Sequence, residues 1–160
     1  MSDFTHFNKE GRAKMVDVSK KTSNVREAVA GGSVFVNAKT LKLITQGEVD
    51  KGDVLAVAQV AGIMAAKRTS EIIPMCHPVA LTGVDLSLTP DENRKTIDIK
   101  ATVRCKGETG VEMEALTAVT AAALTIYDMC KSVQRDIKVG DIRLLRKAGG
   151  NSGTYESGDQ

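Results

Sequence analysis

The chain has 160 residues, of which 22 are basic and 20 acidic, and its net charge of +2 is too small to attract nucleic acids in general. That length is enough for one domain with a hydrophobic core. The three cysteines form no C-x-x-C pair, which argues against a disulfide framework or a closed metal site, so we expect a reducing cytoplasm. No apolar run approaches the ~18 residues of a membrane span, and we expect no membrane partner.

The first half of the chain predicts an arm, a strand and two helical segments. Residues 1–24 are polar and unpatterned, and we expect a flexible arm there. After Gly31 and Gly32, residues 33–37 are predicted as a short strand and residues 39–45 as a helical turn or two.

A long apolar helix is predicted next. Asp53 is a good N-cap for a helix that extends to residue 72. It has to end by Ile73, because Pro74 disfavours helical geometry in the residue before it.

The second half predicts a hairpin, a helix and a last strand. Residues 81–89 and 96–105 alternate apolar with polar side chains on either side of a polar turn, which is typical of a β-hairpin. An alanine-rich helix is predicted from about 111 to 133. Residues 142–146 are predicted as a strand, and residues 149–160 as a flexible tail.

The order β-α-β-β-α-β predicts an α+β fold of the ferredoxin-like kind, with two helices on one face of an antiparallel sheet. We place this single domain at residues 25–148. The helix at 111–133 is apolar or small on nearly all sides. A two-layer fold leaves one flank of such a helix to water, so the composition implies a further buried face and a homo-oligomer.

Asp128 and Lys131 lie three residues apart near the end of this helix, and two interpretations stay open. An i,i+3 pair on the surface is the simpler one. The neighbours Ile126 and Met129 are apolar, however, and a half-desolvated lysine titrates at lower pH and can act as a general acid or base.

Glu112 and Glu114 require separate explanations. Thr109 and Glu112 have the spacing of a capping box, which would give Glu112 a structural role. Glu114 has no basic residue three or four positions later, so it is either solvated or faces a cation outside its helix.

Residues 73–78, with the sequence IPMCHP, place Cys76 and His77 between two prolines. We expect no metal here, because no further ligands lie nearby in the sequence to complete a coordination shell. The prolines stiffen the turn. His77 is a poor partner for its neighbour Cys76, so we do not expect a nucleophilic cysteine. His77 is either a hydrogen-bond or phosphate ligand, or a lone histidine in a turn.

Four segments together resemble one known family. They are residues 15–19 (MVDVS), 61–78 (AGIMAAKRTSEIIPMCHP), 109–119 (TGVEMEALTAV) and 124–131 (LTIYDMCK). In order and content they are similar to MoaC-type cyclic pyranopterin monophosphate synthases, which are enzymes of molybdenum cofactor biosynthesis. The resemblance implies conversion of 3′,8-cyclo-7,8-dihydro-GTP to cyclic pyranopterin monophosphate with release of pyrophosphate. It also implies a hexamer with the ferredoxin-like fold and no metal or redox cofactor.

The resemblance implies which residues line the site. By position these are Asp128, Lys131, Lys51, Met75, Cys76, His77, Glu112, Met113 and Glu114. We assign proton transfer to Lys51 and Lys131, with Asp128 orienting Lys131. The candidates for neutralising the triphosphate are Arg26, Lys67 and Lys147.

The sequence departs from the family pattern at two positions. Glu108 and Asn151 stand where the pattern leads us to expect lysines, so the loops that contain them have less positive charge for binding phosphate.

A non-catalytic nucleotide-binding module is the alternative function. RNA recognition is disfavoured, because the two hairpin strands carry no aromatic side chains on which bases could stack.

The long helix also sets the distance between two of the implied site residues. Glu114 and Asp128 are fourteen residues apart on one predicted helix, about 21 Å along its axis. One nucleotide-sized site cannot easily take both from the same chain. We therefore expect each site to combine Asp128 of one subunit with Glu114 of its neighbour.

Overall fold

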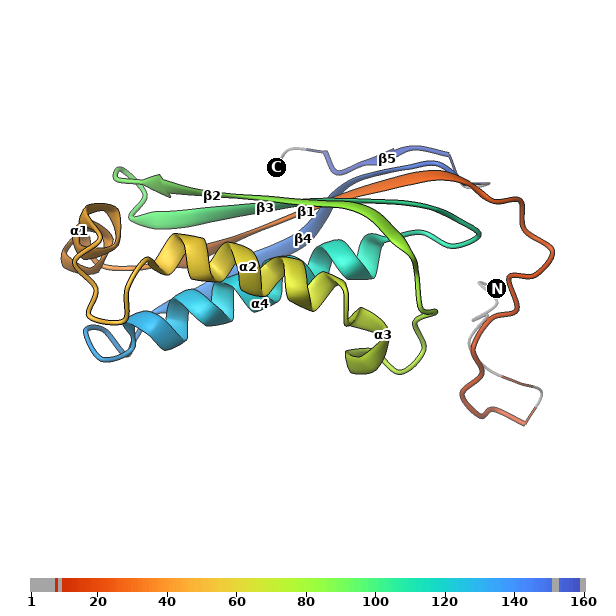
Figure 1. Cartoon of the computed structure of the whole chain (residues 1–160), viewed down its shortest axis with the longest axis horizontal. Helices are drawn as coiled ribbons and strands as arrows, with labels where there is room; N and C mark the ends of the chain where they lie inside the picture. Colours follow the sequence, from red (N-terminus) through yellow and green to blue (C-terminus); the bar gives the residue numbers. More distant parts are fainter. Residues whose placement is uncertain (1–7, 9, 151–152, 159–160) are drawn as a thin grey trace.

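A computed structural model describes residues 8, 10–150 and 153–158 of the chain (Figure 1). The elements in chain order are β1 (Asn24–Phe35), α1 (Ala38–Gln46), α2 (Val54–Ala66), α3 (Thr69–Ile72), β2 (Leu81–Asp91), β3 (Thr96–Gly107), α4 (Glu112–Cys130), β4 (Lys138–Ala148) and β5 (Tyr155–Glu156).

One antiparallel sheet with the strand order β2-β3-β1-β4-β5 forms the frame of the molecule. The helices α2 and α4 lie side by side on the same face of this sheet, and no helix covers the other face in the described chain (Figure 1). The prediction of an α+β fold with ferredoxin-like connectivity is confirmed, and so is the β2–β3 hairpin. The short strand β5 is an addition beside β4.

Strand β1 is much longer than the predicted strand at 33–37, because Gly31 and Gly32 lie inside it and do not interrupt it. The strand is central and pairs with β3 on one side and β4 on the other. A Cβ atom at Gly32 would lie 2.8 Å from the Val119 side chain on α4. The glycine therefore marks a close approach of the helix to the sheet, which is one of the recognised uses of glycine in a strand.

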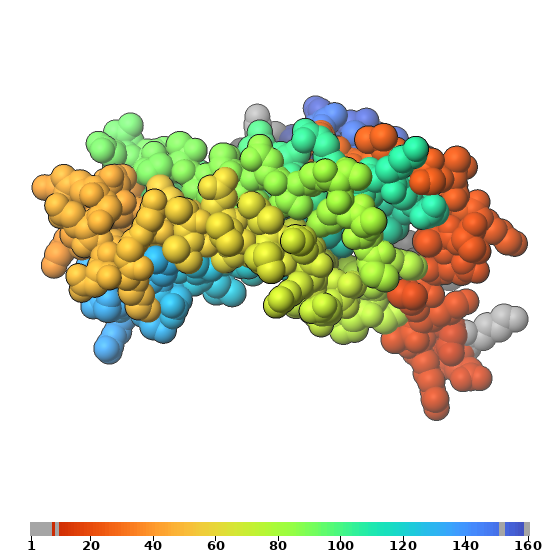
Figure 2. All heavy atoms as spheres, viewed as in Figure 1, coloured from red at the N-terminus to blue at the C-terminus, as the bar shows by residue number. Residues whose placement is uncertain are grey.

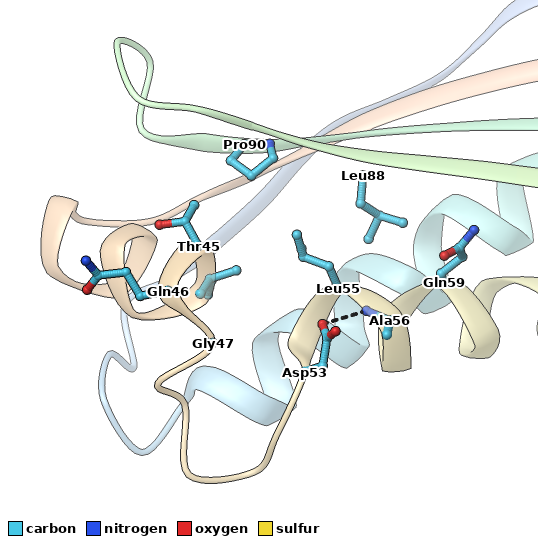
Figure 3. Close-up of a pocket in the computed structure, with 10 residues that line it drawn as sticks. Thr45, Gln46, Gly47, Asp53, Leu55, Ala56, Gln59, Leu88 and Pro90 are labelled. Carbon is cyan, nitrogen blue, oxygen red and sulfur yellow. Dashed lines mark hydrogen bonds between the residues drawn. The ribbon is translucent and has the colours of Figure 1, made fainter.

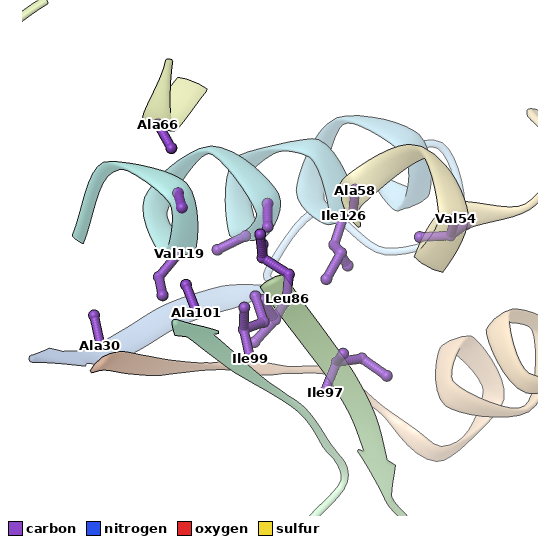
Figure 4. Close-up of a cluster of buried hydrophobic side chains, with 14 of the residues drawn as sticks. Ala30, Val54, Ala58, Ala66, Leu86, Ile97, Ile99, Ala101, Val119 and Ile126 are labelled. Atoms are coloured by element: carbon purple, nitrogen blue, oxygen red, sulfur yellow. The ribbon is translucent and has the colours of Figure 1, made fainter. Parts of the chain in front are cut away.

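The core lies between the sheet and the two long helices (Figure 4). Val119 and Ile126 of α4 are fully buried over Ala30 of β1 and Ile99 of β3. At Gly62 on α2, a Cβ atom would lie 2.9 Å from the carbonyl oxygen of Ala118 on α4, so the two helices are in near backbone contact. The many small residues of both helices thus permit the close packing that holds α4 in place.

The predicted helix at 53–72 is interrupted. Asp53 caps α2 as expected, with its side chain accepting a hydrogen bond from the Ala56 amide, but α2 ends at Ala66. The Thr69 hydroxyl donates to the carbonyl oxygens of Ala65 and Ala66, so the freed carbonyls of the last turn are satisfied by a side chain. The chain then forms the separate short helix α3.

The predicted start of α4 is also corrected. Its N-cap is Val111, which makes no side-chain capping bond, so the capping box of Thr109 and Glu112 does not form. The helix ends at Cys130, three residues before the predicted end.

Part of the predicted tail makes defined backbone contacts with β4. Within the predicted tail, Tyr155 pairs with Lys147, and the Ser157 amide donates to the Leu145 carbonyl oxygen at 2.8 Å. Asn151 lies outside the described residues, as do residues 1–7. The boundaries of the arm, the domain and the tail at 24 and 148 stay predictions.

Candidate active site

The residues implied by the sequence form two clusters at opposite ends of α4. At its C-terminal end, Lys51 reaches α4 from the loop between α1 and α2. Its Nζ lies 2.9 Å from the Asp128 carbonyl oxygen and 3.3 Å from Asp128 Oδ2. The Lys131 Nζ donates to Asp128 Oδ1 at 2.5 Å. Two lysines therefore share one carboxylate where the helix dipole also favours cations.

The charges of this cluster reinforce one another. Hydrogen bonds from Lys131 and then Lys51 lower the pKa of Asp128, and the bond to Asp128 raises the pKa of Lys131. The side chains of Asp128 and Lys131 are 58% and 52% exposed. The expectation that desolvation lowers the pKa of Lys131 is wrong for the single chain, because little of the surrounding water is excluded.

A hollow of about 510 Å³ opens beside this cluster. Lys51 and Lys131 line it together with Tyr127, Ser132 and Arg135. Three cations thus surround one cavity, which suits an anionic ligand. Sequence reasoning missed Arg135; its position four residues after Lys131 was the available signal.

The second cluster lies at the N-terminal end of α4. Glu112 forms an ion pair with Lys147 of β4, with Nζ and Oε1 3.4 Å apart, so its partner lies on a strand distant in sequence. Glu114 is only 4% exposed, and the interpretation that it is solvated is wrong. Burial raises the pKa of Glu114, and the charge of Glu112 raises it further. No cation pairs with Glu114 within the described chain.

Arg26 is the cation most enclosed by the fold at this end. It is only 9% exposed, and its Nε donates to the Gly107 carbonyl oxygen at 2.8 Å. No carboxylate pairs with it among the described residues. Gly150, with φ +79°, packs so closely on its guanidinium that a Cβ atom there would overlap Nη1. A buried guanidinium without a carboxylate calls for another anion, and phosphate is well suited to its fork of donors.

Cys76 and His77 lie in the loop between α3 and β2. Burial raises the pKa of Cys76, and the charge of Glu114 adds to the shift, which places these two groups near each other. The His77 Nε2 lies 2.7 Å from the Val16 carbonyl oxygen, so the N-terminal segment runs past this loop (Figure 1). Sequence reasoning gave Val16 no role, although it lies in one of the four segments that resemble the family.

The other three predicted residues are less closely tied to either cluster. Met113 is 36% exposed and lines an apolar groove of about 290 Å³ with Ile72 and Leu124. Met75 is half-buried in the loop of Cys76. Lys67 is the C-cap of α2, and its side chain makes no hydrogen bond or ion pair among the described residues.

Between the two clusters, the outer surface of the helix layer is apolar. Its exposed large side chains are Val57, Val60, Met64, Ile72, Met113 and Leu124. In Figure 2, α2 (yellow) spans much of the visible face above α4. The isolated chain thus leaves to solvent the further apolar face that the composition of the long helix had predicted.

Another hollow, of about 680 Å³, lies elsewhere, between α1, the start of α2 and β2 (Figure 3). Its polar lining includes Thr45, Gln46 and Gln59, and the carboxylate of Asp53 is engaged in capping α2. None of the predicted site residues lines it, and it offers no cation for a phosphate.

Two further features are absent from the described residues. No three His, Cys, Asp or Glu side chains gather there into a group that could hold a metal ion. None of the helices in that part of the chain is long and apolar enough to cross a membrane.

An antiparallel sheet under two helices, with ionisable clusters at both ends of one helix, defines a protein of the α+β class whose polar groups can transfer protons and bind an anion. The chain belongs to the MoaC family, whose model matches residues 15–150. Its curated relatives include the cyclic pyranopterin monophosphate synthase of Thermoanaerobacter sp. (strain X514), which is 61% identical over 154 residues, or 96% of this chain and 98% of the relative. The synthase of the same name from Heliobacterium modesticaldum is 57% identical over 155 residues, or 97% of this chain and 98% of the relative.

Proposed function

We propose that this protein converts 3′,8-cyclo-7,8-dihydro-GTP to cyclic pyranopterin monophosphate with release of pyrophosphate, as a phosphorus–oxygen lyase of molybdenum cofactor biosynthesis. The observation that carries the proposal is the Lys51–Asp128–Lys131 cluster beside a cationic hollow. The names of the curated relatives, at 54–61% identity, support it.

The steps of this reaction need acid–base groups and fixed cations. Rebuilding the rings moves protons between carbon, nitrogen and oxygen atoms. Closing the cyclic phosphate forms one P–O bond as the bond to pyrophosphate breaks. Lys51 and Lys131 hold and transfer protons at Nζ. Asp128, whose pKa is lowered by both lysines, remains ionised and orients them. None of these steps requires a metal or redox cofactor.

The anionic part of the substrate belongs to the other end of α4. Arg26 and Lys147 lie there, next to the first turn of the helix, where backbone N–H groups and the helix dipole favour phosphate. The enclosed guanidinium of Arg26 is the strongest single feature in favour of this assignment. Lys67 is the weakest of the three candidates, because the structure gives it no partner in either cluster.

We further propose that each site is shared by two copies of the chain. Glu114 and Asp128 are about 21 Å apart along α4, too far for one nucleotide-sized site. An antiparallel arrangement of two copies through the exposed apolar face would bring the start of one α4 to the end of the other. The same contact would exclude water from Lys131 and bring its pKa closer to neutrality. A trimer of such dimers gives the hexamer implied by the family.

The three cysteines are free thiols, and we place this enzyme in the reducing cytoplasm. We also keep the division into an arm at 1–24, a catalytic domain at 25–148 and a tail at 149–160.

Incubation of the pure protein with 3′,8-cyclo-7,8-dihydro-GTP tests the function directly. We expect stoichiometric pyrophosphate and a product with the spectrum of a pterin. The Lys42→Ala protein, altered at an exposed lysine of α1 that belongs to neither cluster, should behave as the wild type. Binding of the intermediate without release of pyrophosphate would overturn the proposal and favour a nucleotide-binding module.

A further inference from the structure

One hydrogen bond joins the N-terminal segment to the loop of predicted site residues. The two atoms are His77 Nε2 and the Val16 carbonyl oxygen, 2.7 Å apart and 61 residues apart in sequence. Both residues are half-buried. A backbone carbonyl can only accept, so the ring nitrogen has to carry the proton. The contact therefore places a proton on Nε2 of His77.

The bond determines which nitrogen of the ring remains for a ligand. With a proton on Nε2, the neutral ring has an unprotonated Nδ1, which can accept a hydrogen bond but cannot donate one. Nδ1 has no hydrogen-bond partner within the described part of the chain. The ring is also held firmly, because Pro74 and Pro78 restrict the loop and the Cys76 amide donates to the Ile73 carbonyl oxygen at 3.1 Å.

The segment that contains Val16 has its own local structure. The Asp17 carboxylate accepts a hydrogen bond from the Ser19 amide at 2.9 Å, and the Lys21 amide donates to the Val18 carbonyl oxygen at 2.9 Å. These turns present the Val16 carbonyl to the ring from a segment with no helix or long strand of its own. The bond to His77 thus ties this segment to the domain.

We propose that the N-terminal segment, residues 10–23, positions His77 by fixing its Nε2–H tautomer, so that Nδ1 accepts a hydrogen bond from an N–H or O–H group of the substrate. This inference rests on the proposed function. It assigns His77 to the base or sugar of the nucleotide, which carry N–H and O–H donors. The phosphates carry only acceptors at neutral pH and bind elsewhere.

The charges around the loop favour the same assignment. Asp17 is close enough that His77 adds a small part to the lowering of its pKa, after the larger contribution of the Ser19 hydrogen bonds. The charge of Glu114 also raises the pKa of Cys76, the residue next to His77, after the larger contribution of burial. These carboxylates attract the partly positive hydrogens of N–H and O–H groups.

Nitrogen-15 NMR of the full-length protein tests the tautomer. Spectra that correlate ring nitrogens with carbon-bound ring protons distinguish the two neutral forms, and the His77→Gln protein identifies the His77 signals against the chain's one other histidine. At a pH where the ring is neutral, we expect a proton on Nε2. A proton on Nδ1, or rapid averaging between both forms, would overturn the proposal.

Ligand titrations test the assignment of Nδ1. We expect GTP and the cyclised GTP intermediate to shift the Nδ1 resonance of a ring that stays neutral, and pyrophosphate alone to leave it unchanged. Protonation of both ring nitrogens on addition of pyrophosphate would show that His77 binds phosphate, and it would contradict the proposed role of Nδ1. None of these readings depends on turnover, so they stand or fall separately from the proposed activity.

Two full-length variants separate the tie to Val16 from the contact with substrate. Gln places its amide donor near the position of Nε2, whereas the shorter Asn cannot reach Val16. We expect both His77→Gln and His77→Asn to lower kcat/KM by about 10- to 100-fold, the scale for a lost positioning contact. Only His77→Asn should accelerate hydrogen exchange of the Ser19 and Lys21 amides. Unchanged exchange in His77→Asn would show that the bond does not hold the segment.

Discussion

Lys51 holds Asp128 at two points across 77 residues of sequence, through the backbone carbonyl oxygen at 2.9 Å and Oδ2 at 3.3 Å. Lys131 occupies the remaining carboxylate oxygen, Oδ1. Each lysine thus has a defined position relative to the other, set by a carboxylate between them. A surface ion pair formed only by helix spacing would consist of Asp128 and Lys131 alone. The addition of Lys51 from another part of the chain makes the cluster suitable for proton transfer.

The first prediction concerns this cluster. We expect Lys51→Ala, Lys131→Ala and Asp128→Asn each to lower kcat for pyrophosphate release by at least about 100-fold, the lower end for a lost proton-transfer group. All three side chains are substantially exposed in the single chain, so the free energy of unfolding should change little. Steady-state kinetics and thermal unfolding measure the two effects. Near-normal turnover in all three variants would show that the three residues form only a surface ion-pair cluster without a catalytic role.

The second prediction concerns Cys76. Burial and then the charge of Glu114 raise its pKa, so less thiolate is present at neutral pH than for an ordinary thiol. Native protein should therefore react with iodoacetamide more slowly than glutathione does at pH 7, and Glu114→Gln should increase the rate. Cys76→Ser should keep most of kcat/KM, and exhaustive chelation should not lower activity. A loss above about 100-fold in Cys76→Ser would instead indicate a covalent role.

How far local sequence predicts the structure is clear at the helix ends. Asp53 caps α2 as expected, because donor and acceptor are three residues apart. The Thr109–Glu112 pattern is equally local, yet Glu112 pairs with Lys147 of a distant strand, and this tertiary contact prevails. Gly31 and Gly32 mislead in the same way, because the close approach of Val119 that requires a glycine at 32 cannot be read from neighbouring residues.

In the candidate site, too, contacts between residues close in sequence could be predicted, and contacts between distant residues could not. The ion pair of Asp128 and Lys131 could be predicted from their spacing along the helix alone. The approach of Lys51 to Asp128 and of Val16 to His77 depends on how loops are placed by the fold. The family resemblance indicated Lys51 but not its contact. Burial of Glu114 and Arg26 was beyond local reasoning for the same physical reason, since burial is a property of the packed chain.

The third prediction uses two glycines that lie between β4 and β5 in the sequence. Gly150 and Gly153 both have left-handed backbone, with φ of +79° and +67°, so alanine costs about 1–2 kcal/mol at either position. Only at Gly150 would the added Cβ overlap the Arg26 guanidinium, whereas it meets nothing within 4 Å at Gly153. We expect Gly150→Ala to raise KM and weaken pyrophosphate binding by about tenfold, the loss of ~1.4 kcal/mol of binding energy. Gly153→Ala is the matched control for backbone strain.

Isothermal titration with pyrophosphate and steady-state kinetics provide both measurements for these variants. Equal effects of Gly150→Ala and Gly153→Ala would mean that strain alone acts and that Arg26 does not bind the phosphates.

The last prediction follows from the distance between the clusters. Glu114→Ala and Asp128→Ala proteins, each inactive alone, are unfolded and refolded together so that subunits exchange. If two copies share two sites, random mixing makes about half of the pairs mixed, and each mixed pair has one intact site beside one doubly altered site. Activity should therefore recover to about a quarter of the wild-type value under this two-fold geometry. Mixing Asp128→Ala with Lys131→Ala is the matched control, since both residues lie in one cluster of one chain and no mixed pair regains an intact site. Recovery in the control, or none in verified Glu114→Ala and Asp128→Ala mixed oligomers, would contradict a site shared between subunits.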